Sequence, residues 1–459
     1  MQTLNFINRK ARTLGATALL LSASACSFNQ IDPVPDPNAA GLGLDGIITN
    51  PSPAQLNLLA VGTEASLRLG HAGRGQYNQL TGTFGREVYI LALNDNRYYT
   101  ELLGTNTNLD PAGPYNDVYT GFSRARHAAI VFRGSAETAS FLTAAQKQGV
   151  RGYTHTVEAL AMLHLANVQF DNGIRLDISN IYKPSKFTES YQGVLDAINT
   201  LLTTAASELA AGGGDFGFPL SGGYADFDTP ATYLKFNRAL AARVNLYRKD
   251  YTAAQATLAA SFYDPAGSLT VGPKIVFNAG AANDIGNPYA QNLNSSVSTL
   301  ITAQKDFVTQ AEAGDARLNK VSARTAPRTL GGLTGSFDPN LFTQGSPLDI
   351  IRNEELILIA AEINIEKASP DFAAAVAQLN IIRTKAGRLP AYAGASTKTA
   401  LENELLNQRR YSLFYEGHRW VDMRRFGRLA QLPLDLPTHK VFDRMERPIG
   451  EVQWDQANP

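Results

Sequence analysis

The sequence is poor in cysteine, histidine and tryptophan, with one, six and two copies among 459 residues. One cysteine excludes a disulfide within the chain, and no pair of histidine or cysteine residues has the spacing of zinc ligands. The 41 basic residues are balanced by 41 acidic ones, so the chain lacks the overall positive field that attracts nucleic acid. We therefore expect no metal, no cofactor and no nucleic-acid partner.

Sequence motifs of the common enzyme classes are also missing. The chain has no G-x-S-x-G, H-E-x-x-H, Walker or EF-hand pattern. Gly41, Gly43 and Gly46 match G-x-G-x-x-G, but they follow a proline-rich stretch, and no βαβ pattern surrounds them. Acidic pairs are expected by chance among 41 acids, so their spacing does not define a glycosidase site. The sequence predicts that the protein is not an enzyme.

What the chain does have is enough apolar sequence for a packed core, with 44% hydrophobic residues. Most of these residues recur every three or four positions, which is typical of helices. Segments rich in Gly, Asn, Asp and Pro are predicted as long loops, which often carry function. The fold class predicted is mainly all-α. Helices are expected at 54–69, 115–132, 144–170, 191–209, 232–248, 252–262, 353–367, 372–385 and 401–415, and long loops at 94–114, 211–230, 264–299 and 325–348.

Three of the expected helices begin with one local template. Asp250-Tyr251 and Asp371-Phe372 are each followed by Ala at the fifth position and Leu at the ninth, and Ser190-Tyr191 begins a looser copy. Each copy follows a helix rich in small residues, against which a partner helix can pack closely. This is the packing of tetratricopeptide-like helical hairpins, here separated by long loop insertions that we expect to form the ligand-facing surface.

The N-terminal segment has the features of a signal peptide. Arg9, Lys10 and Arg12 precede a short apolar stretch, and small residues lead into Cys26, the only cysteine. This resembles a bacterial lipoprotein signal, in which the cysteine is acylated and becomes the first residue. An ordinary signal peptide cut near Ala25 is the alternative. We expect a signal peptide at 1–25, a flexible tether at 26–53, and one body at 54–459.

The stretch RRYSLFYEGHRWVDMRRFGRL, from Arg409 to Leu429, combines many arginines with aromatic rings. A nucleic-acid surface would need unpaired, exposed cations, and a catalytic site would need its acids in a cleft. Guanidinium groups also stack on rings and bind carboxylates, which favours a half-buried structural cluster. We expect Glu416-Gly417 to end one helix, Trp420 to begin another, and Arg419 to pair with carboxylates.

The same stretch resembles the C-terminal pattern of the SusD-like (SusD/RagB) family. The match includes basic residues, Glu-Gly, Arg-Trp-x-Asp and a further arginine, and an upstream block from Arg352 to Gly387 also fits. This resemblance divides the body into an N-terminal half, about 54–349, and a C-terminal SusD/RagB region, about 350–459. The residues assigned to this structural motif are Arg409, Glu416, Gly417, Arg419, Trp420, Asp422 and Arg425.

The resemblance implies an outer-membrane lipoprotein at the cell surface that captures a nutrient. It also implies a partner, a SusC-like TonB-dependent transporter, to which the ligand would be passed. The expected ligand is an oligosaccharide. A tetratricopeptide scaffold for protein or peptide and, less favoured, a glycoside hydrolase are the alternatives.

The residues expected to bind ligand are Asn94, Asn96, Arg97, Tyr98 and Tyr99, in one predicted loop. Sugars stack their C–H faces on aromatic rings and exchange hydrogen bonds with amide and guanidinium groups. Two adjacent tyrosines beside these groups supply both kinds of contact. Tyr77, with Asn78 and Gln79, is a second and weaker candidate.

If Cys26 carries the membrane anchor, Cys26→Ser should move the protein from the membrane to the soluble fraction. Two acyl chains give stable anchoring, whereas a single chain is marginal. Cell fractionation after a high-salt wash measures the change, and an unaltered melting temperature would show that the fold is intact. A variant that stays with the membrane would refute the lipoprotein signal.

Overall fold

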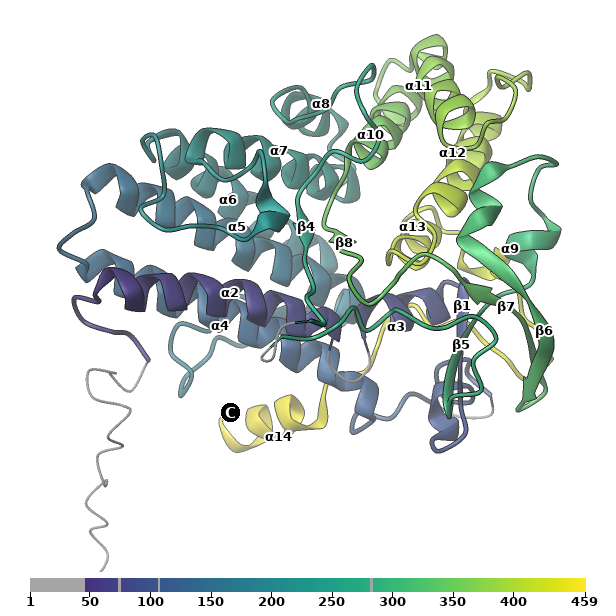
Figure 1. The fold of residues 1–459 in the computed structure, drawn as a ribbon, viewed down its shortest axis with the longest axis horizontal. Coiled ribbons are helices and arrows are strands. Elements are labelled where there is room, and N and C mark those ends of the chain that lie inside the picture. Colours follow the sequence, from purple (N-terminus) through teal and green to yellow (C-terminus); the bar gives the residue numbers. More distant parts are fainter. Residues whose placement is uncertain (1–45, 73–75, 106–107, 281–283) are drawn as a thin grey trace, which may run out of the picture. The chain divides into compact units, whose positions relative to one another are not determined.

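The computed structural model describes residues 46–72, 76–105, 108–280 and 284–459. Cys26, the signal segment 1–25 and most of the tether lie outside the described residues. Residues Ile47–Pro459 form one compact unit. Helices lie across the whole width of this unit in Figure 1, and a small sheet formed by β1, β5, β6 and β7 lies at its right-hand edge.

Each of the nine helices predicted from hydrophobic periodicity is present, with shifted ends. Consecutive helices pack on one another, α4 on α5, α5 on α6, α6 on α7 and α10 on α11 (Figure 1). The predicted fold class, mainly helical with hairpins, is confirmed. These helices are α2 (Pro53–Ala72), α4 (Asp117–Thr138), α5 (Ala144–Gln169), α6 (Tyr191–Ala210), α7 (Pro230–Tyr247), α8 (Tyr251–Ala259), α10 (Asn353–Glu366), α11 (Phe372–Lys385) and α12 (Lys398–Ser412).

The repeated template corresponds to a helix start. The side chains of Ser190, Asp250 and Asp371 each accept a hydrogen bond from a main-chain N–H in the first turn of the helix that follows. This satisfies a donor that the helix itself leaves free. In the next turn Ala254 and Ala375 are fully buried. The template therefore combines an N-cap with a small residue that lets the neighbouring helix approach.

A four-stranded antiparallel sheet is the main feature that periodicity did not predict. Its strand order is β1-β5-β7-β6. The segment expected as a loop at 325–348 instead contains most of a β-hairpin, in which Leu330 pairs with Leu333 across Gly331-Gly332. Both glycines have positive φ, as a two-residue hairpin turn requires. The strands are β1 (Val88–Ala92), β5 (Thr299–Ala303), β6 (Val321–Leu330) and β7 (Leu333–Pro339).

Several shorter elements complete the fold. Among them α3 lies in a segment where no helix was predicted, and α14 is the last helix of the chain. The remaining elements are α3 (Tyr77–Phe84), α9 (Asp306–Thr309), α13 (Arg419–Arg425), α14 (Ile449–Ala457), the pair β2 (Ile174–Arg175) with β3 (Phe187–Thr188), the pair β4 (Lys274–Ile275) with β8 (Leu348–Asp349), and several 3-10 turns.

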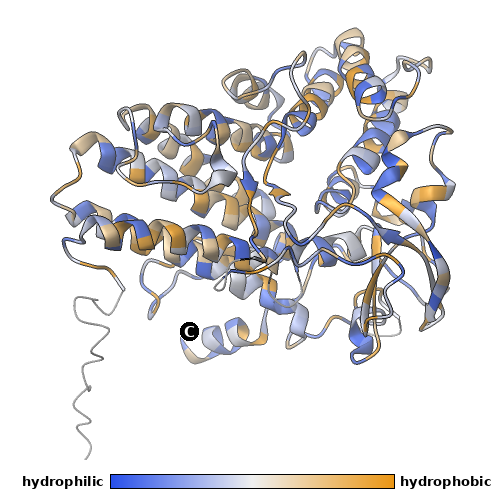
Figure 2. Cartoon of the chain, viewed as in Figure 1, coloured by the Kyte–Doolittle hydropathy of each residue, from blue (hydrophilic) through white to orange (hydrophobic). Residues whose placement is uncertain are grey.

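Hydrophobic and hydrophilic residues both occur along the helices in Figure 2, and α10 is buried on nearly all sides. Within the described part of the chain, no helix has the length and apolar content needed to cross a membrane.

In the C-terminal stretch, the structure corrects one predicted boundary. Helix α12 ends at Ser412, before Glu416-Gly417, and the chain then turns through Tyr415 and Gly417, both with positive φ. Trp420 lies in α13 and is fully buried. Its ring stacks on Phe84 with centroids 4.7 Å apart, and its Nε1 donates to Phe442 O at 2.8 Å.

The arginines of this stretch form ion pairs that differ in part from those expected. Asp422 accepts from Arg409 Nε at 2.6 Å and from Arg425 Nε at 3.0 Å, and Arg425 also pairs with Glu362 of α10. Glu416 pairs instead with Arg352, 64 residues earlier in the chain. Arg419 donates to a main-chain oxygen, and no carboxylate pairs with it among the described residues. The expected pairing of Arg419 with a carboxylate is therefore wrong.

Trp420→Ala should lower the free energy of unfolding by about 3–5 kcal/mol, the usual cost of removing a large buried aromatic side chain. Chemical denaturation measures this. Trp454→Ala is the matched control, because α14 contributes no fully buried residue. Equal stability of the two variants would mean that the Trp420 ring is not part of the core.

Candidate functional site

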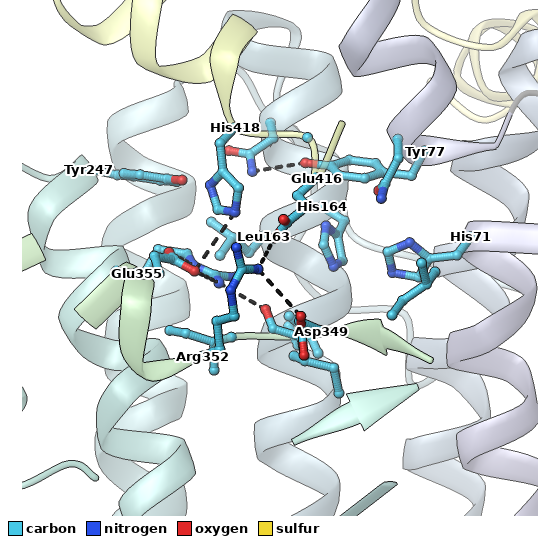
Figure 3. Close-up of a pocket in the computed structure, with 18 residues that line it drawn as sticks. His71, Tyr77, Leu163, His164, Tyr247, Asp349, Arg352, Glu355, Glu416 and His418 are labelled. Atoms are coloured by element: carbon cyan, nitrogen blue, oxygen red, sulfur yellow. Dashed lines mark hydrogen bonds and ion pairs between the residues drawn. The ribbon is translucent and has the colours of Figure 1, made fainter. Parts of the chain in front are cut away.

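A small polar cavity lies in the interior between α5, α3 and the chain around residues 348–355 and 416–418. Figure 3 shows three histidines, from α2, α5 and the turn before α13, whose rings converge with carboxylates and an arginine. The rings of His71 and His164 meet edge to face with centroids 5.0 Å apart. The cavity encloses about 30 Å³, enough for one or two water molecules but not for a sugar.

The charged groups around this cavity are already paired. Burial alone would raise the pKa of Glu355, but the Arg243 guanidinium, with Nε 2.6 Å from Oε1, holds that pKa at about 2. Burial lowers the pKa of His418 to about 4, although Glu355 opposes the shift. Burial likewise lowers the pKa of His71 to about 4. The histidines are therefore neutral at pH 7, and the cavity behaves as a polar part of the core.

The acids that line this cavity are held by arginines. Glu355 is ionised and bound to Arg243, and Glu416, whose pKa is raised by burial, is paired with Arg352. Among the described residues, no group of three or more histidine, cysteine, aspartate or glutamate side chains could hold a metal ion.

A more open groove of about 370 Å³ is lined mainly by amides and small polar residues. Gln79 comes from the first turn of α3, and Gln291 from the segment that leads into β5. Gln291 is fixed in place, since its side chain bonds both the N–H and the carbonyl of Ile301. Gln76 Oε1 is buried and has no hydrogen-bond partner among the described residues. The polar residues of this amide-lined groove are Gln76, Gln79, Gln291, Asn292, Ser295, Thr299 and Gln344.

The loop predicted to bind ligand does not line this groove, but it begins at the same end of the sheet. Strand β1 ends at Ala92, which pairs with Thr299 at the start of β5, and Leu93 N donates to Ser298 O at 2.8 Å. The loop residues that follow therefore leave the sheet at the same end as the groove-lining segment 288–299. No periodicity in the sequence shows this proximity, because more than 190 residues separate the two segments.

Within the loop, the polar side chains are more accessible than the rings. Asn94 and Asn96 are exposed, and Arg97 is half-exposed while Asp95 holds its Nε at 2.9 Å. Asp95 also caps the short 3-10 turn Asn96–Tyr98. This ion pair fixes the guanidinium of Arg97 at the surface, where its remaining N–H groups can reach a ligand.

The two tyrosines are half-buried against apolar residues. Tyr98 packs against the main core, and Tyr99 against a small cluster that contains Leu91. Gly331 of the β6–β7 turn lies so close that an added Cβ would come within 2.5 Å of the Tyr99 ring. Each tyrosine ring is therefore only partly accessible to a ligand.

The residues of the second candidate segment, 77–79, lie at two different sites. Tyr77 and Asn78 are buried and face the interior cavity, and only Gln79 lines the amide-lined groove. The groove itself draws on two regions that the sequence predicted as long loops, 264–299 and 325–348. The individual amides Gln76, Gln291 and Gln344 were not predicted, because they converge only in the folded chain.

With the fold and site described, the chain can be compared with known proteins. The model of the SusD family matches residues 340–458. No match is found among curated proteins.

Solved structures share the fold at low sequence identity. A SusD superfamily protein from Bacteroides vulgatus superposes with a TM-score of 0.64 at 16% identity, covering 88% of this chain and 97% of that one. Surface glycan-binding protein A from Bacteroides thetaiotaomicron, in complex with laminarihexaose, gives 0.67 at 13% identity, with 88% and 98% covered. A laminarin-binding SusD-like protein gives 0.59 at 17% identity, also with 88% and 98% covered.

These similarities define a protein with the SusD-like fold over most of its length. The family model itself matches the C-terminal part, residues 340–458.

Because His418 is buried in the interior cavity, we expect the free energy of unfolding to fall in mild acid. Because the pKa of His418 is about 4 in the folded protein and about 6.5 when unfolded, the unfolded chain binds the extra proton first as the pH falls. Stability from this group is therefore complete above pH 6.5 and declines toward pH 4, by on the order of 1–3 kcal/mol.

Replacing His418 tests this directly. His418→Gln should flatten the dependence of unfolding free energy on pH between 6.5 and 4, measured by urea denaturation at several pH values. His127→Gln in α4 is the control. An unchanged slope in His418→Gln would show that His418 takes up its proton in the folded state.

Proposed function

We propose that the protein binds an oligosaccharide without cleaving it, at the amide-lined groove and the adjoining loop Asn94–Tyr99. The observation that carries this proposal is the set of amide side chains that line one open groove, at the end of the sheet where the loop begins. Amides both donate and accept hydrogen bonds, which matches the hydroxyl groups of a sugar, and tyrosine rings can stack on its C–H face. The groove volume suits a ligand of a few sugar rings.

The comparisons support the ligand class. Two proteins that share this fold are described as binding laminarin or laminarihexaose, which are neutral glucose polymers. The polar side chains of the groove carry amides and hydroxyls rather than charges, which suits a neutral glycan. A tetratricopeptide scaffold for peptides is the second candidate, favoured only by the helical hairpins.

The cellular role that we propose rests on the family. SusD-like proteins are associated with the outer membrane, and we propose that this chain is a lipoprotein anchored there through Cys26. Its proposed partner is a SusC-like TonB-dependent transporter that receives the bound nutrient.

A soluble protein beginning at Gln30 tests the function. Calorimetry with laminarihexaose and a panel of other oligosaccharides measures binding, and chromatography of the same samples detects cleavage. Saturable binding with the sugar recovered intact supports the proposal. Cleaved sugar would establish a hydrolase, and binding to peptides but to no glycan would favour the scaffold.

Truncating the loop should weaken glycan binding without abolishing it. Tyr98→Ala/Tyr99→Ala should reduce affinity by on the order of 1 kcal/mol per ring, because stacking contacts are individually modest. The half-burial of both rings means that the melting temperature should also fall. Asn94→Ala/Asn96→Ala changes only exposed side chains, so it should reduce affinity and leave melting unchanged.

Tyr182→Ala is the matched control for the ring truncations, since Tyr182 is an exposed tyrosine far from this groove in sequence. It should bind glycan as the unmodified protein does. If the loop variants and Tyr182→Ala have equal affinity in calorimetry, the loop is not part of the binding surface.

A further inference from the structure

A second polar cavity lies at the opposite end of β1 from the amide-lined groove. It adjoins the residues just before Val88, whereas the groove adjoins the sheet end at Ala92. The five residues of β1 separate these ends by about 13 Å. The cavity encloses about 220 Å³, and we call it the arginine cavity. Its polar lining consists of Arg86, Glu87, Asp306, Gln310, Arg410, Arg419 and Gln431.

Arg419 is the cation with the fewest protein partners in this cavity. Its one hydrogen bond among the described residues is a long one, from Nη1 to Leu406 O at 3.4 Å. Burial, and then repulsion from Arg410, lower the pKa of Arg419 to about 10, so the group stays charged at an energetic cost. A guanidinium with free N–H groups has the planar fork that binds carboxylate, sulfate or phosphate.

Two further arginines add positive charge to the same wall. Arg410 donates from Nη1 to the side chain of Gln310 at 2.8 Å, which leaves its other N–H groups available. Arg86 is buried and donates to main-chain oxygens, including Thr83 O at 2.9 Å. Burial lowers the pKa of Arg86 to about 10. Within the described residues, none of the three arginines forms an ion pair with a carboxylate.

The acids in the cavity do not neutralise these three charges. Burial raises the pKa of Glu87 to about 8, although the Tyr415 N–H and Arg419 act against the shift, so Glu87 is mostly uncharged at neutral pH. Asp306 accepts from the Gln310 side chain at 3.1 Å. Three arginines therefore share a partly enclosed space with Glu87 and Asp306, and Glu87 is mostly uncharged at neutral pH.

We propose that the arginine cavity binds one small oxyanion between Arg410 and Arg419. The ligand is either a free ion, such as sulfate or phosphate, or the carboxylate or sulfate group of an acidic sugar. The cavity is smaller than the sites of drug-sized ligands, so it has room for one ionic group or a single sugar ring. An oxyanion would accept hydrogen bonds from both guanidinium groups and offset their repulsion.

This binding goes beyond the proposed capture of a neutral glycan, and a different part of the sheet carries it. A protein that fails to bind anions could still bind glycan at the amide-lined groove. A protein that fails to bind glycan could still bind anions at the arginines. The two proposals can therefore fail separately.

The test uses the purified protein, with calorimetry and thermal unfolding in sulfate, phosphate, glucuronate and glucose 6-sulfate. Sodium chloride at equal ionic strength and glucose are the ligand controls. We expect saturable binding of sulfate, and affinity about tenfold weaker in Arg410→Gln, which loses a charge-assisted hydrogen bond. Binding of the two acidic sugars identifies a sugar substituent as ligand, and binding of the inorganic ions alone identifies a free ion.

Arg388→Gln is the matched control variant, because Arg388 is an exposed arginine that lines a different groove. Arg419→Lys keeps the charge but loses the guanidinium fork, so it should also weaken sulfate binding. Absence of saturable binding by all four anions would overturn the proposal. Equal affinity in Arg410→Gln and Arg388→Gln would overturn it as well.

Discussion

The chain of buried ion pairs Arg409–Asp422–Arg425–Glu362 joins α12, α13 and α10, and the C-terminal half of the fold depends on it. All four side chains are almost entirely buried, so each charge relies on its partners for the interactions that water would supply. Removing one member strands the rest in a region of low dielectric constant, which typically costs several kcal/mol. Because α13 is held in this way, Trp420 is brought onto Phe84 of α3, and α3 in turn supplies Gln79 to the proposed glycan groove.

The helices were predictable because their signal is local. Hydrophobic spacing and N-caps such as Asp250 and Asp371 act within one or two turns, so the sequence contains most of the information that defines them. The β6–β7 hairpin also had a local signal, Gly331-Gly332 between apolar residues, which the prediction of a loop at 325–348 overlooked. The sheet pairing of β1 with β5 had none, since it joins segments about 200 residues apart.

The site was predictable only in part, for the same reason. The loop Asn94–Tyr99 could be selected because its residue types suit a sugar, and the structure brings it next to the segment 288–299. The burial of Tyr99 could not be predicted, since the Gly331 turn that covers it belongs to a distant hairpin. The amide-lined groove could not be predicted either, because its glutamines lie in three separate segments and none carries a motif.

The arginines of the C-terminal stretch show how position, rather than residue type, decides what a side chain does. Arg409 and Arg425 meet carboxylates on neighbouring helices, and their charges hold the fold together. Arg419 and Arg410 lie in the same stretch but turn toward a cavity whose one buried carboxyl, Glu87, is mostly protonated. A cation in the first setting has carboxylate partners in the protein, whereas a cation in the second has only neutral partners among the described residues and can bind an anion from solution. One basic stretch thus supplies both a structural network and an electropositive cavity, and the difference is set by which backbone segments lie opposite each guanidinium.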